Sequence, residues 1–133
     1  METLLKNRAH AGQIKQFSGL KFGAISPTDL DAFLDFGDRL FIFVEAKYKN
    51  SPLPFGQRLA LERLCDATHN PPHRHSILIL SSHESDGDIQ MSETIVQQYR
   101  LNRVWYQATD ITLREAIEMF YTNFCITKKE DKE

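Results

Sequence analysis

Three ionisable side chains in the first half of the chain have the types and the spacing of a metal site. Asp31 is followed by Glu45 and, two residues later, by Lys47. Carboxylate oxygens are the ligands that hard ions such as Mg²⁺ or Mn²⁺ prefer. An ion held there could polarise a phosphodiester and lower the pKa of a bound water molecule, and the ammonium group could stabilise charge on the phosphate. These residues therefore indicate phosphodiester chemistry.

Two predicted strands, residues 29–36 and 40–47, would position these side chains on either side of a turn at Gly37–Arg39. Side chains alternate between the two faces of a strand. Antiparallel pairing that sets Leu34 opposite Ile42 gathers the apolar side chains on one face, namely Leu30, Ala32, Leu34, Phe36, Leu40, Ile42, Val44 and Ala46. A slip of one residue would bury carboxylates against the core, so we expect this register, with an odd-length loop or a bulge at the turn.

The same register predicts a polar cluster on the opposite face. Asp31 would lie opposite Glu45, and Asp29 would lie opposite Lys47. Three clustered carboxylates repel one another unless a cation neutralises them. The sequence therefore predicts a Mg²⁺ or Mn²⁺ site with Asp31, Glu45 and Asp29 as ligands. The spacing Glu-x-Lys alone carries little weight, because Glu130-x-Lys132 in the tail matches it too.

The other predicted elements surround this hairpin and suggest one α/β domain. They are helices over residues 2–16 and 55–68, a buried strand over 76–80, a hairpin over 94–100 and 103–107, and a helix from Thr112 with a capping box to Glu115. Periodicity in the predicted hairpin also fits a helix. The order predicts a single-domain α/β/α sandwich with a central mixed sheet over residues 1–127, followed by a disordered charged tail over residues 128–133.

Composition limits the class of protein. The 133 residues are 41% hydrophobic and 26% charged, as in ordinary soluble domains. No apolar run could span a bilayer and the N-terminus lacks a signal-peptide layout, so we expect a cytoplasmic protein with Cys65 and Cys125 as free thiols. The net charge of −2 argues against coating of nucleic acid by bulk charge. Basic residues do flank the acidic segment 28–47, although charge alone favours scattered solvated groups.

The order of Asp31, then Glu45-Ala46-Lys47 on the next strand, resembles the PD-(D/E)XK nuclease superfamily and its restriction-endonuclease-like fold. Residues 22–68, roughly a third of the chain, look like small nucleases and resolvase-like proteins of phage and prophage. The resemblance implies that Asp31 and Glu45 bind metal, that Lys47 assists the attacking water and that Asp29 is an accessory acid. Gln57 matches a glutamine that some relatives place at the start of the following helix. Pro27 and Leu61 depart from the family pattern.

We therefore expect a Mg²⁺- or Mn²⁺-dependent deoxyribonuclease that acts on DNA. A chain this small has little room for a sequence-reading domain, so structure-selective or non-specific cleavage is expected, in a homodimer if the likeness to junction resolvases extends that far. One alternative is a non-catalytic nucleic-acid-binding or assembly subunit that keeps the fold. Another is a zinc-stabilised module that uses Cys65, His69, His73 and His75.

Overall fold

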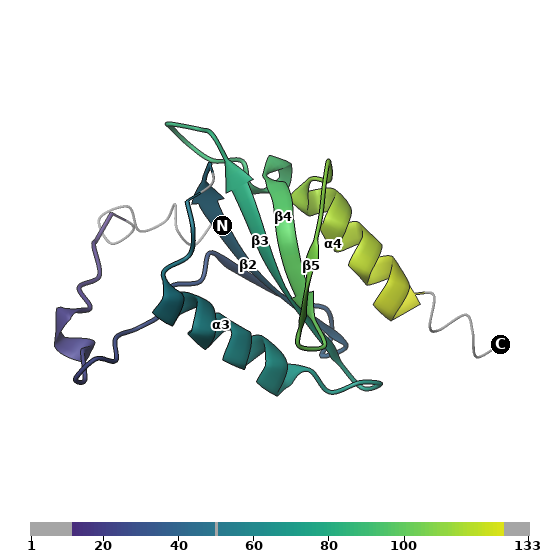
Figure 1. The fold of residues 1–133 in the computed structure, drawn as a ribbon, viewed down its shortest axis with the longest axis horizontal. Coiled ribbons are helices and arrows are strands. Elements are labelled where there is room, and N and C mark those ends of the chain that lie inside the picture. Colours follow the sequence, from purple (N-terminus) through teal and green to yellow (C-terminus); the bar gives the residue numbers. More distant parts are fainter. Residues whose placement is uncertain (1–11, 50, 127–133) are drawn as a thin grey trace.

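A five-stranded mixed sheet forms the centre of the structure, a computed structural model that describes residues 12–49 and 51–126 (Figure 1). The strands are β1 (Ala32–Asp35), β2 (Leu40–Tyr48), β3 (His75–His83), β4 (Ile95–Leu101) and β5 (Val104–Gln107). They lie in the sheet in the order of the sequence, β1-β2-β3-β4-β5. β2 and β3 run parallel, whereas the other neighbouring pairs are antiparallel. The protein is therefore a mixed α/β structure.

One helix packs on each face of this sheet, as Figure 1 shows. Helix α3 (Phe55–Thr68) connects β2 to β3 and packs Leu61 and Cys65 against Phe43 and Leu78. Helix α4 (Leu113–Tyr121) covers the other face and adds Leu113, Ala116 and Phe120 to the core there. A π-helical turn, η3 (Thr122–Ile126), extends this helix. Two short 3-10 helices complete the described elements, η1 (Ser18–Leu20) and η2 (Met91–Glu93).

The hairpin of β1 and β2 has the predicted register. Ala32 pairs with Val44 and Leu34 pairs with Ile42. The loop Gly37–Arg39 has an odd number of residues and begins after Phe36, whose amide donates to the carbonyl oxygen of Leu40 at 2.9 Å. Gly37 adopts a φ of 63°, which glycine reaches without the cost that a Cβ would add. The apolar face then joins the core on the α4 side, because Leu40, Ile42 and Val44 are completely buried. Leu30 is the exception: it precedes β1 and packs against the cluster on the α3 side.

Most of the other predicted elements are confirmed. Helix 55–68 has the predicted bounds, the hairpin of β4 and β5 forms in place of a helix, and Thr112 and Glu115 make the capping box of α4. The predicted strand 76–80 is longer, at His75–His83, because it pairs along the whole of β2. The predicted strand 29–36 is shorter, since β1 begins only at Ala32.

The N-terminal helix prediction is wrong where it can be compared. Residues 12–16 are not helical, and residues 1–11 lie outside the described residues, as does the predicted tail 128–133. The apolar side chain of Ile14, on which the predicted helix partly depended, stays exposed to solvent. Without a core surface to cover, an amphipathic pattern contributes little to helix stability. No helix in the described part of the chain is long and apolar enough to cross a membrane.

Candidate active site

Glu45 is the centre of the candidate site, and it lies in the second half of β2 with 2% of its surface exposed. Its side chain points to the α3 side of the sheet, as do those of Phe41 and Phe43, which alternate with the core residues. Charged side chains are almost never buried to this extent unless they have partners. The neighbours of Glu45 therefore decide what this carboxylate can do.

Asp31 lies next to Glu45 through two hydrogen bonds that cross the hairpin. The Asp31 amide donates to Oε1 of Glu45 at 3.2 Å, and the Ala46 amide donates to Oδ2 of Asp31 at 2.8 Å. Asp31 comes immediately before β1, so the hairpin register places it beside Glu45 as predicted. The structure thus brings two carboxylates together at one end of the hairpin.

Lys47 and Gln57 complete the cluster from the other side. Nζ of Lys47 lies 3.4 Å from Oε2 of Glu45, and Nε2 of Gln57 donates to the same oxygen at 2.6 Å. Gln57 stands in the first turn of α3 and also donates to the backbone carbonyl of Asp29 at 3.2 Å. Helix α3 therefore presents the glutamine to the site, and this amide links β2 to the segment that precedes β1.

The charges of this cluster do not balance, because two carboxylates face one ammonium group. Burial raises the pKa of Glu45 above its ordinary value, and the Asp31 carboxylate raises that pKa further. Lys47 and Gln57 lower the pKa, but the net direction remains upward. A cation bound between Asp31 and Glu45 would remove the repulsion that opposes ionisation of Glu45.

The third expected carboxylate, Asp29, does not share this geometry. β1 begins at Ala32, so the strand pairing does not extend to the expected pair of Asp29 with Lys47. Asp29 contributes its backbone carbonyl to Gln57 instead. The hairpin expectation failed because it extended a regular ladder into a segment that leaves the sheet. No group of three or more His, Cys, Asp or Glu side chains is gathered like a metal site anywhere in the described residues.

Two carboxylates are nevertheless a usual protein contribution to a Mg²⁺ site. Mg²⁺ keeps several waters and takes one or two carboxylates together with substrate phosphates. The donor set of Asp31 and Glu45 consists of hard oxygen atoms alone, which fits Mg²⁺ or Mn²⁺ and disfavours zinc. These residues therefore fit a divalent ion whose remaining ligands are water and substrate.

The residues of the alternative zinc site have other partners. His73 lies 3.0 Å from Asp38, and Nδ1 of His69 accepts from the Ser76 amide at 3.0 Å. Cys65 is buried on the face of α3 that packs on the sheet, where its thiol donates to the Ser76 carbonyl, and burial raises its pKa to about 12. A thiol with such a pKa stays protonated at neutral pH and is neither a nucleophile nor a ready metal ligand.

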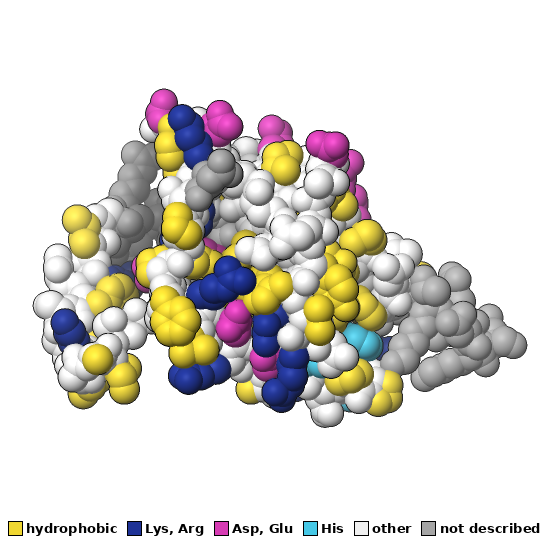
Figure 2. All heavy atoms as spheres, in the orientation of Figure 1, with side chains coloured by type: hydrophobic (Ala, Val, Ile, Leu, Met, Phe, Trp, Pro, Cys, Tyr) yellow, Lys and Arg dark blue, Asp and Glu magenta, His cyan; other side chains and the backbone are white. Residues whose placement is uncertain are grey.

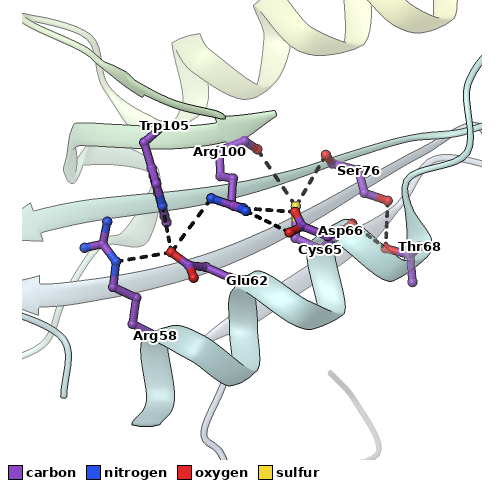
Figure 3. A network of polar contacts seen from close by, with 8 residues as sticks. All are labelled: Arg58, Glu62, Cys65, Asp66, Thr68, Ser76, Arg100 and Trp105. Atoms are coloured by element: carbon purple, nitrogen blue, oxygen red, sulfur yellow. Dashed lines mark hydrogen bonds and ion pairs between the residues drawn. The ribbon is translucent and has the colours of Figure 1, made fainter. Parts of the chain in front are cut away.

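Sequence reasoning missed a second polar network, which lies between α3 and β4–β5. Its members are Arg58, Glu62, Asp66, Arg100 and Trp105, and Figure 3 shows them beside Cys65, Thr68 and Ser76. Arg100 donates twice to Asp66, at 2.9 and 2.8 Å, and the indole of Trp105 donates to Glu62 at 2.8 Å. In Figure 2, basic and acidic side chains alternate over this region. Arg58, Glu62 and Asp66 follow one another at helical spacings of four, but their partners Arg100 and Trp105 are distant in sequence, so no spacing motif predicts the complete network.

Basic and aromatic residues beside the site were also missed as functional candidates. A hollow of about 260 Å³ next to Lys47 is lined by Lys49 and Arg58 as well. Phe55, the first residue of α3, is 79% exposed. The only signal in the sequence was the excess of basic residues after residue 47, which does not by itself distinguish a binding surface from solvated charges.

Comparison of the chain with protein-family models, with curated proteins and with solved structures found no match. A functional conclusion for this protein therefore depends on the geometry of Asp31, Glu45, Lys47 and Gln57. These four residues come from three separate segments, and they converge within hydrogen-bond or ion-pair distance.

Proposed function

We propose that this protein is a divalent-metal-dependent DNA nuclease with a PD-(D/E)XK-type site in an α/β/α sandwich. The observation that carries the proposal is the convergence on Glu45, whose buried carboxylate receives Gln57 and Lys47 on one oxygen and the Asp31 amide on the other. A surface ion pair would need neither the burial of Glu45 nor a second carboxylate beside it.

Each residue has a role that its position supports. Asp31 and Glu45 would hold Mg²⁺ or Mn²⁺, which when bound supplies Lewis-acid polarisation of the phosphodiester and a more acidic water. Lys47 lies on the same face of β2 as Glu45 and is partly exposed, so its ammonium group can stabilise negative charge on the phosphate. Gln57 is a positioning residue, because its amide fixes Glu45 and the chain at Asp29.

DNA cleavage by the full chain tests this proposal. Supercoiled, linear, single-stranded and four-way-branched DNA are incubated with Mg²⁺, Mn²⁺ or chelator, and the products are mapped. We expect metal-dependent cleavage that falls by about 10²–10³-fold in Lys47→Ala, the usual loss for one charge-stabilising group. Glu45→Gln should lose at least as much, because metal Lewis acidity contributes several kcal/mol. Gln57→Ala should lose about 10–100-fold, as expected for a residue that orients a ligand.

A matched control separates the site from general effects of charge. Glu118→Gln makes the same chemical change on α4, where Glu118 is exposed and pairs with Arg114 at 3.4 Å. This variant should cleave like the wild type. Full activity of Glu45→Gln, or cleavage that persists in chelator, would contradict the proposal. Binding of DNA without cleavage in either metal would favour the non-catalytic alternative.

A further inference from the structure

The hollow beside Lys47 is lined by basic and hydroxyl-bearing side chains. It lies where β2 ends and α3 begins, has a volume of about 260 Å³, and is lined by Lys47, Lys49 and Arg58 together with the hydroxyl-bearing Ser81 and Ser82. None of its described lining residues is acidic. Three cationic side chains with hydroxyl donors are the chemistry that proteins use to hold a phosphate group.

Arg58 is held in an orientation that keeps part of its guanidinium available. The guanidinium carbon lies 4.4 Å from the centre of the Trp105 ring, and Nε contacts Glu62 at 3.4 Å. Figure 3 shows that the two terminal nitrogens point away from Glu62. They have no hydrogen-bond partner among the described residues. Stacking on the indole thus fixes the group while two nitrogens remain free to bind an anion.

Lys49 adds a second cation to the hollow. Its Nζ lies 5.2 Å from the centre of the Tyr48 ring, and Lys49 makes no ion pair with any residue that the structure describes. A lysine without a carboxylate partner contributes its whole charge to the potential in the hollow. Lys49 therefore differs from the other two cations of the hollow, because Lys47 pairs with Glu45 and Arg58 pairs with Glu62.

Phe55 supplies a flat apolar surface in the segment that joins the hollow to the site. It follows Leu53, which lines the hollow, and precedes Gln57, which contacts Glu45. The first position of a helix does not require an apolar side chain. Phe55 nevertheless occupies it with an aromatic ring, and this residue is 79% exposed. Aromatic side chains beside cationic grooves are stacking surfaces for unpaired bases.

We propose that an unpaired DNA strand crosses this face, with a phosphate in the hollow of Lys49 and Arg58 and a base stacked on Phe55. This inference rests on the proposed nuclease function and names its substrate class. The hollow is too small to admit a double helix, and a paired base does not expose its face for stacking. A strand bound in this way lies with its adjacent phosphate toward Lys47 and Glu45.

Binding in chelator tests the inference without cleavage. A labelled single-stranded oligodeoxynucleotide, and the same strand in a duplex, are titrated with the full chain while fluorescence anisotropy is recorded. We expect tighter binding of the single strand, and Phe55→Ala should weaken that binding at least about fivefold. Phe55→Trp should preserve it, because tryptophan also stacks. Neither change should alter duplex binding.

Salt dependence tests the phosphate contact independently. Lys49→Gln should reduce the slope of log affinity against log salt by about 0.7, the value for one phosphate contact on a single strand. Arg114→Gln removes an exposed charge on α4 and should leave the slope unchanged. Both Lys49 and Phe55 are exposed, so melting temperatures of the variants should match the wild type.

The outcomes separate this inference from the proposed function. Equal loss of single-strand and duplex binding in Phe55→Ala, an unchanged slope in Lys49→Gln, or tighter binding of duplex by the wild type would each overturn the inference. If the wild type cleaves DNA with Mg²⁺ but shows one of these results, only the inference fails. If single-strand binding depends on Phe55 and Lys49 but no DNA is cleaved with Mg²⁺ or Mn²⁺, the nuclease proposal fails and the binding surface stands.

Discussion

The cluster around Glu45 and the network around Glu62 lie on the same side of the sheet, yet their charges are arranged differently. Around Glu62, two carboxylates face the guanidinium groups of Arg58 and Arg100. Around Glu45, two carboxylates lie together and one ammonium group pairs with Glu45. The Arg100 hydrogen bonds lower the pKa of Asp66, whereas burial and Asp31 raise the pKa of Glu45.

This difference separates stabilising polar contacts from contacts that prepare chemistry. A network with matched charges is satisfied within the protein, and its removal costs stability. A cluster with excess negative charge is relieved by a bound cation or by protonation of one carboxylate. The two regions should therefore respond in opposite ways to mutation, to pH and to divalent metal.

The largest effect on stability is expected when the balanced network is broken. Arg100 is 13% exposed in its side chain and Asp66 is 17% exposed, so Arg100→Leu leaves a carboxylate without its partner in a largely dry place. We expect a loss of about 2–4 kcal/mol in the free energy of unfolding, near the range for broken buried pairs. Urea unfolding measures it. Arg114→Leu, whose ion pair is exposed, should cost under about 0.5 kcal/mol; a similar cost in both variants would contradict the distinction.

A smaller effect is expected from acid, with opposite signs in the two regions. The folded pKa of Asp66 lies below its unfolded value, so its contribution is present above about pH 4 and is lost as the pH falls through the folded pKa. The stability difference between wild type and Asp66→Asn should therefore shrink below about pH 4. Urea unfolding at a series of pH values measures this difference.

Glu45 provides the contrasting case in metal-free protein. Its folded pKa is raised, so the folded state binds the proton more tightly and the wild type loses stability relative to Glu45→Gln as the pH rises above about 4 through that raised pKa. Matching signs for Asp66→Asn and Glu45→Gln would mean that the two regions are electrostatically alike.

The smallest effect is expected from Asp31→Asn, and it should appear only with metal. In chelator this change relieves repulsion and should leave stability unchanged or slightly raised. Wild type at an ion concentration ten times the dissociation constant should gain about 1.4 kcal/mol, or roughly 3–6 °C in melting temperature. The variant should lose most of that gain. Thermal unfolding with chelator and with Mg²⁺ or Mn²⁺ checks this, and equal metal responses would show that Asp31 is no ligand.

The sequence predicted the hairpin and its polar end because both follow from local rules. Alternation in residues 30–46 allows one register that buries only apolar side chains, and that register places Asp31 beside Glu45. Helix α3 was equally predictable, since Pro54 precedes it and Asn70-Pro71-Pro72 follows it. The position of Gln57 relative to Glu45 came from a family resemblance, and the structure places the two side chains in contact.

The remaining features depend on contacts between distant segments. Asp29 is two residues from Asp31, but its departure from the sheet is set by the path of the chain before β1. Phe55 resembled any apolar residue of an amphipathic helix, and only the fold shows that it faces solvent. Arg100 and Asp66 are 34 residues apart, and their pairing requires α3 to lie across β4.

The loop Gly37–Arg39 also limits how this protein can vary over time. Surface loops usually tolerate insertions and deletions. Here a deletion that slid β1 by one residue along β2, so as to keep a three-residue turn, would turn every β1 side chain to the other face relative to β2 and set Asp31 against Val44. Glu45 is five residues, or about 17 Å, along β2 from Leu40, the first residue after this loop. We expect descendants of this sequence to keep the glycine at Gly37, whose φ is 63°, and to keep the number of loop residues for as long as Asp31 and Glu45 are needed together.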